Sequence, residues 1–302
     1  AAYPIKVFLG DLGHDYTGQR QDEWDLVRSQ MNAFLDHHLV GASPVPYDVG
    51  ATVTRCLDHD APMRYVAAPT WNELHPASVT FASDADGVTS SAVVGQAGLA
   101  TDPISTATLP LPGAYKGCRK MSPSMADPTT ATYLFRAEHD LVLMGGPVLD
   151  VTFDTTGPDT ELNARVWDVA EDGSVQGLVT RGTYRSVDGP GMGLKARFQI
   201  APNGYRFPAG HAVKLEVTAN DAPYYQQSNV PAVVRVDGVH LTLPLFEEPA
   251  APAVAPVAAA PAPVRTIPTT GGGVPFGVGV AALAVGLLSL VSGRRGRRPS
   301  PR

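Results

Sequence analysis

Hydrophobic and polar residues alternate in several short runs across the middle of the chain. The clearest run is residues 213–218 (VKLEVT), and residues 162–167, 196–200 and 233–243 behave likewise. Asp-Gly, Pro-Asn-Gly and Pro-Ala-Gly sequences, which are typical of turns, separate these runs. Because no long helical pattern lies between them, residues 43–247 are predicted to form a mainly β domain, a jelly-roll-like antiparallel β-sandwich.

The first 42 residues have a different pattern. Residues 5–9 (IKVFL) are predicted to form a buried strand, and a loop with two glycines and His14 follows. Over residues 22–39 apolar side chains recur every three or four positions, which predicts an amphipathic helix that ends before Gly41. One strand and one helix are too short to bury their own apolar faces. Residues 1–42 are therefore predicted to be a strand-helix remnant of an α/β domain.

The composition changes near residue 248. Residues 248–272 are rich in Pro and Ala, which suits an extended linker. Residues 274–291 carry no charge, and a helix of 18 residues spans about 27 Å, near the lower limit for crossing a bilayer. Residues 273–292 are therefore predicted to form a transmembrane helix, with the Arg-rich tail of residues 293–302 in the cytoplasm. The body of the protein is then expected outside the cytoplasm, anchored at the cell surface.

A short motif precedes this apolar segment. Ile267-Pro268-Thr269-Thr270-Gly271, the apolar segment and the basic tail follow one another in the order that resembles a sortase cell-wall sorting signal, with Ile in place of the usual Leu. The resemblance implies cleavage between Thr270 and Gly271, with a sortase as partner and the cell wall as anchor. A simple membrane anchor is the alternative interpretation.

The charge of the chain excludes one class of partner. The 302 residues carry 23 basic and 29 acidic side chains, a net charge of −6. Residues 249–302 contain six Arg and no acid, so residues 1–248 hold 17 basic against 29 acidic side chains, a net charge of −12. An acidic body does not suit nucleic acid, because phosphate contacts need a positive face.

Neither metal nor cofactor is expected from the motifs. Residues 58–60 (DHD) are adjacent and would rarely point at one ion, so a solvated turn is favoured. Residues 168–173 contain two Asp and a Gly but lack the acidic ladder and terminal Glu of a calcium loop, so a strand-end turn is favoured.

Cys56 and Cys118 are the two cysteines of the chain. Outside the cell such a pair is expected to be oxidised, and a disulfide closing a loop of this size stabilises a fold by about 4 kcal/mol in the chain-entropy model. Two buried free thiols are the alternative.

His14 is the main candidate for chemistry. A histidine in a loop directly after a buried strand can be presented at the edge of a parallel sheet, where α/β hydrolases keep their general base. From spacing alone, a loop histidine with no role is the favoured interpretation, and the surrounding sequence changes this. Over residues 1–247 the chain resembles the C-terminal part of serine hydrolases of the Xaa-Pro dipeptidyl-peptidase and CocE/NonD group. The matching positions are Gly10, Gly13 and His14, and in the second half residues 164–169, 172–173, 178–182, Phe198, 208–211, 215–217, 221–225 and 241–244.

The resemblance implies that His14 is the histidine of a Ser-Asp-His triad. No Gly-x-Ser-x-Gly motif occurs in the 302 residues, so the nucleophile and the acid are expected in a preceding part of the enzyme. The implied function is the C-terminal region of a cell-surface serine hydrolase, a dipeptidyl-peptidase or an ester or acyl hydrolase. Its peptide or ester substrate would bind through the missing catalytic domain, and the chain alone is expected to be inactive.

The alternative function is a non-catalytic, surface-anchored β-sandwich that binds carbohydrate or another protein. Tyr224 and Tyr225 follow a turn sequence and are predicted to contact a neighbouring domain, with ligand binding as the second interpretation. Trp167 lies within a predicted strand and is expected in the core. His211 is expected to make a structural hydrogen bond.

Overall fold

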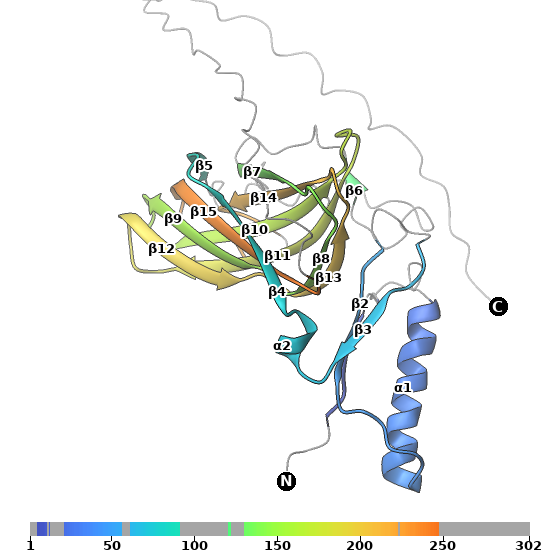
Figure 1. Ribbon diagram of the computed structural model, residues 1–302. Helices are drawn as coiled ribbons and strands as arrows, with labels where there is room; N and C mark the ends of the chain where they lie inside the picture. The colour runs from blue at the N-terminus through green and yellow to red at the C-terminus, as the bar shows by residue number, and fades with distance from the viewer. Residues whose placement is uncertain are drawn as a thin grey trace, which may run out of the picture. The chain divides into compact units, whose positions relative to one another are not determined.

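A computed structural model of the chain is shown in Figure 1. The structure describes residues 5–10, 12, 21–55, 61–90, 120–121, 130–222 and 224–247. Within these residues the fold has an N-terminal α/β unit and a β-sandwich.

The α/β unit is a small sheet with one long helix beside it. Strand β1 (Val7–Leu9) pairs in parallel with β2 (Val49–Thr52), and β3 (Tyr65–Ala68) pairs with β2 in the antiparallel sense. Helix α1 (Gln21–Val40) connects β1 to β2, which is the crossover that a parallel pair requires. The predicted helix is found, and Gly41 ends it with a positive φ of 75°. The predicted strand is found over residues 7–9 only, and it is not buried as expected, since Val7 and Phe8 are half-buried and Ile5 and Leu9 are exposed. The short helix α2 (Trp71–Leu74) leads on to the sandwich.

The sandwich has a five-stranded sheet and a seven-stranded sheet, in which all strand pairs are antiparallel (Figure 1). The five-stranded sheet has the order β6-β11-β10-β14-β7; its strands are β6 (Lys120–Met121), β7 (Ala131–Arg136), β10 (Thr160–Val169), β11 (Gln176–Ser186) and β14 (Ala212–Thr218). The seven-stranded sheet has the order β12-β9-β15-β8-β13, with two further strands on β15; its strands are β4 (Ala77–Ser83), β5 (Gly87–Ser90), β8 (Leu141–Gly145), β9 (Val148–Thr155), β12 (Gly191–Gln199), β13 (Asn203–Phe207) and β15 (Val233–Leu245).

The core lies between the two sheets. Strand β9 alternates buried and half-buried residues, so its buried side chains share one face of the sheet. That face packs on inward residues of the other sheet in a single cluster, which includes Leu149, Val151, Phe153, Leu162, Ala164 and Val166. Full burial of a Leu, Val or Phe side chain stabilises the fold by about 1.5–3 kcal/mol. The antiparallel sandwich predicted from the alternating pattern is present.

Strand β10 departs from the simple pattern. Every one of its residues is buried, including the polar ones that alternate with Leu162, Ala164 and Val166. Alternation in the sequence predicts a solvent-facing polar side. In the folded chain both faces of this strand are covered, so its charged side chains must find partners away from water.

The predicted fold class is wrong in its C-terminal part. In the portion of the chain that the structure describes, neither helix is long and apolar enough to cross a membrane. Helix α1 carries charged side chains along its length, and α2 has only four residues. Residues 273–292, where the transmembrane helix was predicted, lie outside the described residues.

The α/β unit and the sandwich meet closely at Gly204 in β13. The backbone nitrogen of Thr54 donates to the carbonyl of Gly204 at 2.7 Å. A Cβ atom on Gly204 would lie 2.4 Å from the carbonyl oxygen of Thr52, which is too close for any side chain. Glycine is therefore required at position 204 for packing, because any side chain there would collide with the Thr52 backbone.

Gly204→Ala is expected to lower the free energy of unfolding by about 1–3 kcal/mol, because the contacting atom belongs to the backbone and cannot turn away. Urea denaturation of both proteins measures the change. Gly238→Ala is the matched control, since the nearest atoms to its Cβ would lie at 3.6 Å, an ordinary contact. Equal stability of the two variants would contradict the prediction.

Candidate functional site

The candidate site lies at the carboxyl edge of the parallel pair β1–β2. Ligands of open α/β sheets bind at this edge, because the loops that follow parallel strands meet there. Gly10 follows β1 directly, and a Cβ on it would lie 2.6 Å from the ring of Phe8 and 3.3 Å from the Glu23 carboxylate. The strand end and the first turn of α1 are therefore in close contact.

Two acidic residues hold the start of α1 against the end of β2. Glu23 is fully buried and accepts a hydrogen bond from the hydroxyl of Thr52 at 2.7 Å. Arg55 donates to both oxygens of Asp22 at 2.8 Å and to Glu23 at 3.2 Å. The guanidinium lowers the pKa of the Asp22 carboxyl, mainly through these hydrogen bonds. Acids in the first turn also suit the helix dipole.

Both ends of the β1–α1 connection are thus tied to β2. A pocket of about 320 Å³ lies beside it, lined by Gly10 and Leu12 of the connection, by residues of β2 and by the sandwich residues Met144 and Asn203. Its walls include Phe8, Leu9, Trp71 and Pro202, so it suits an apolar group.

The residues predicted from the sequence to form sites lie outside the described residues. This holds for His14, for both cysteines of the predicted disulfide, Cys56 and Cys118, and for Thr270 and Gly271 of the sorting-like motif. Their roles stay predictions. Of the His14 loop, the structure describes Gly10 and Leu12 before the histidine and the helix after it.

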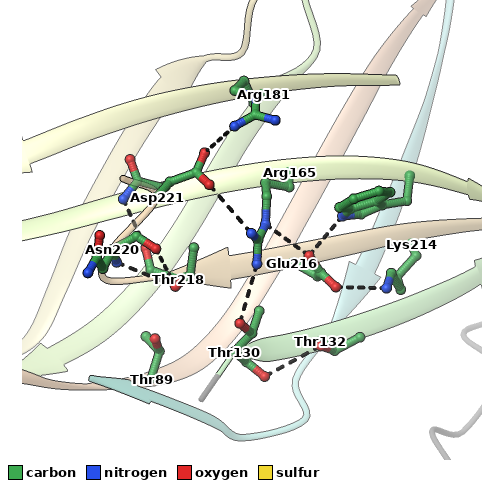
Figure 2. Close-up of polar contacts among 12 residues, drawn as sticks. Thr89, Thr130, Thr132, Arg165, Arg181, Lys214, Glu216, Thr218, Asn220 and Asp221 are labelled. Atoms are coloured by element: carbon green, nitrogen blue, oxygen red, sulfur yellow. Dashed lines mark hydrogen bonds and ion pairs between the residues drawn. The ribbon is translucent and has the colours of Figure 1, made fainter. Parts of the chain in front are cut away.

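A buried charge cluster on the outer face of β10 was not predicted (Figure 2). We use this name for Arg165, Arg181, Lys214, Glu216 and Asp221. Asp221 lies between two guanidinium groups, 3.4 Å from Nη1 of Arg165 and 3.0 Å from Nη1 of Arg181. Glu216 lies 2.9 Å from Nε of Arg165 and 2.7 Å from Nζ of Lys214, and its Oε2 also accepts a hydrogen bond from Trp167.

The cluster could not be found from sequence spacing. Asp221 lies 56 residues from Arg165 and 40 from Arg181, so only strand pairing brings these side chains together. Trp167 is buried as expected, but its indole N–H is used to orient Glu216 at 2.8 Å. The ring of Tyr224 stacks on the Arg181 guanidinium at 3.8 Å and keeps 41% of its surface exposed. The predicted interdomain contact of this tyrosine stays a prediction.

Glu161, at the start of β10, is a buried carboxyl with an incomplete set of partners. Its Oε2 atom has no hydrogen-bond partner among the described residues. Burial raises the pKa of the Glu161 carboxyl to about 7, against a smaller opposing effect of the hydrogen bond with Asn163. Because its ordinary pKa is 4.5, the folded chain binds more protons than the unfolded chain between about pH 4.5 and 7.

The free energy of unfolding is therefore expected to fall as pH rises from about 4.5 to 7, because Glu161 loses its proton over this range. Glu161→Gln removes the titrating carboxyl, so the free energy of unfolding should vary less with pH between pH 5 and pH 7.5. Urea denaturation at several pH values measures this. Glu138→Gln, at an exposed carboxylate, is the control. If Glu161→Gln followed the same pH profile as the wild type, the carboxyl would not be protonated in the folded state.

A second polar group joins three side chains of the sandwich. The ring nitrogen Nδ1 of His211 lies 2.8 Å from one oxygen of Asp168, and the hydroxyl of Tyr205 donates to the other oxygen at 2.8 Å. The hydrogen bond expected of His211 is confirmed. The strand-end turn expected near Asp168 is also present, since Asp172 accepts from the backbone nitrogen of Ser174.

Comparison with known proteins gives one family match. Residues 123–253 match the X-Pro dipeptidyl-peptidase C-terminal non-catalytic domain. No curated protein matches the chain.

Solved structures share the fold over a longer stretch. An aminopeptidase from a marine-sediment Thaumarchaeota archaeon has a TM-score of 0.58 at 16% identity, covering 80% of this chain and 49% of its own. An α-amino acid ester hydrolase has a TM-score of 0.59 at 14% identity, covering 80% and 50%. A CocE/NonD family hydrolase from Staphylococcus aureus has a TM-score of 0.52 at 11% identity, covering 80% and 54%. The chain thus spans about half the length of the solved structures it resembles.

Proposed function

We propose that the chain is the C-terminal region of a serine hydrolase. Two findings support this: residues 123–253 match the C-terminal non-catalytic domain of the X-Pro dipeptidyl-peptidase family, and the fold is shared with CocE/NonD-type hydrolases. The proposed reaction is acyl transfer from a peptide or ester substrate. His14 is the proposed general base, and the nucleophilic serine and the aspartate belong to the preceding part of the enzyme.

The open edge of the small sheet carries this proposal. Strand β1 lies at the end of the strand order β1-β2-β3, and Leu9 is exposed there. Parallel sheets normally have both faces and their central strands covered. A parallel strand with apolar side chains at a free edge therefore supports the presence of further strands beside β1 in the whole protein.

The exposed face of α1 supports the same conclusion. Met31, Leu35 and Leu39 recur every four residues and expose 51%, 43% and 75% of their surface, and only Glu23 of the whole helix is fully buried. An apolar groove between β1 and α1, of about 190 Å³ and lined by Phe8 and Met31 among others, is open beside them. A stripe of this kind is a surface that needs a packing partner.

In the proposed mechanism His14 transfers a proton twice. In acyl transfer the imidazole accepts the serine proton as the oxygen attacks the carbonyl carbon, and then gives that proton to the leaving group. The aspartate holds the imidazole in the right tautomer and stabilises its cation. The sandwich would contribute to the substrate cleft through the apolar pocket beside Gly10 and Leu12, since Met144 and Asn203 line it.

The test compares this chain with the longer protein that its reading frame encodes upstream. The longer protein is expected to hydrolyse X-Pro amides or simple esters and to react with a fluorophosphonate at serine. The chain of 302 residues alone is expected to do neither. Labelling or turnover by the chain alone, or an inactive longer protein without a Gly-x-Ser-x-Gly elbow, would overturn the proposal and favour a non-catalytic binding module.

A further inference from the structure

A second pocket, of about 540 Å³, lies next to the group of His211, Asp168 and Tyr205. One wall comes from residues 53–55, 61, 62 and 64, between β2 and β3, and the other from β10, β13 and the turn that follows β13. Its volume falls in the range of small-molecule sites, about 300–1,000 Å³. Nothing in the proposed acyl transfer uses it.

One nitrogen of His211 is committed and the other is left for the pocket. Asp168 is fully buried, and each of its oxygens already has a partner: one forms a hydrogen bond with Nδ1 of His211, and the other accepts from the hydroxyl of Tyr205. The side chain of His211, 18% exposed, lines the pocket. With Nδ1 used in this way, Nε2 is the ring nitrogen of His211 that can contact a ligand in the pocket.

Two arginines add further donors at the rim. Arg206 pairs with Asp140 through Nε and Nη2, and Arg64 pairs with Glu247 through Nη2. A guanidinium has five N–H groups, so each of these arginines keeps donors beyond those that its carboxylate takes. Asp168 is the one acid among the described residues that line the pocket, and its oxygens are turned to His211 and Tyr205. The ligand that matches these side chains is a hydrogen-bond acceptor with negative charge.

The remaining wall is apolar. Val53, Ala61, Pro62 and Pro208 line the same pocket. A bare inorganic anion would leave this surface in contact with water, whereas a ligand with a short apolar body would cover it. We propose that this pocket binds a small organic carboxylate, with the carboxylate between His211, Arg64 and Arg206 and the apolar part against the valine and proline side chains.

This proposal does not depend on hydrolase activity. It rests on residues that are all described by the structure, and the chain of 302 residues is sufficient to test it. An inactive enzyme with a functional pocket, or an active one without it, would separate the two proposals.

The experiment is a titration of the whole chain with benzoate, benzamide and inorganic phosphate. Isothermal calorimetry measures the affinities, and NMR of the histidine ring nitrogens reports contact with His211. Benzoate is expected to bind at least about tenfold more tightly than benzamide, since the two differ in charge and not in shape. Benzoate should also bind more tightly than phosphate and shift the ring signals of His211. His211→Gln and Arg64→Gln are each expected to weaken benzoate binding by about tenfold.

Two controls keep the result interpretable. His240→Gln changes an exposed histidine of β15 and should leave benzoate binding unchanged. Arg64→Gln removes an exposed ion pair with Glu247 and a cation–π contact with Phe246, and it tests the site even if His211→Gln lowers the melting temperature. Equal affinity for benzoate and benzamide, equal affinity for phosphate and benzoate, or unchanged binding in the Arg64 variant would each overturn the proposal.

Discussion

Replacing His14 with alanine in the longer protein is expected to lower kcat/KM by roughly 10⁴-fold or more, with little change in stability. Without the imidazole the serine hydroxyl keeps its proton, and its attack on the substrate carbonyl loses the general base and the later general acid. The reaction with a fluorophosphonate should slow as well, because it needs the same activated oxygen. Steady-state kinetics on an X-Pro amide or ester and the labelling rate measure the two effects.

His240→Ala is the matched control for this experiment, since His240 is exposed on β15. Its kcat/KM should stay within about twofold of the wild type, the range of surface changes that touch no substrate. A His14→Ala protein that kept a tenth or more of the wild-type kcat/KM would remove His14 from the mechanism. The loop would then have only a structural role.

Asp221→Asn is expected to lower the free energy of unfolding by about 3–5 kcal/mol. The variant keeps the size of the side chain but removes a carboxylate that contacts both Arg165 and Arg181. Arg165 is completely buried, so water cannot replace the lost charge. Urea denaturation monitored by tryptophan fluorescence measures the loss, since Trp167 donates a hydrogen bond to Glu216 of the same cluster.

Two further variants test the cause of that loss. Asp150→Asn breaks an exposed pair with Arg197 and should change the free energy of unfolding by no more than about 1 kcal/mol. Adding Arg181→Met to Asp221→Asn removes one of the two cations and should restore part of the stability. A loss below 1 kcal/mol for Asp221→Asn, or no recovery in the double variant, would show that the cluster is hydrated in solution.

Local patterns were sufficient for much of the fold. The alternation of residues 213–218 predicted β14, and the three- and four-residue spacing after residue 21 predicted α1 to within about one residue at each end. Such patterns work because a strand or a helix presents its side chains with a fixed period, whatever it packs against. They could not assign β2 and β3 to a sheet, because pairing with β1 depends on contacts between segments distant in sequence.

For the candidate sites, single residues could be identified from the sequence, but their partners could not. The glycines around His14 and the turn before His211 are local signals, so the sequence could single out these two histidines. The partners of His211 lie elsewhere in the chain, with Asp168 at a distance of 43 residues, so sequence spacing does not predict these contacts. The same is true of Arg55, which ties Asp22 and Glu23 to the end of β2 from 33 and 32 residues away.

Local patterns predicted several strands of the sandwich and the long helix, because period and turn chemistry act over a few residues, and short motifs carried the resemblance to the hydrolase group. The burial of the polar face of β10 is seen only in the folded chain. The alternation of that strand is the usual mark of a face in water, yet Arg165 and Asp168 are completely buried. Whether a polar face is wet or buried depends on what covers it and which charges meet there, and both follow from the packing of distant segments.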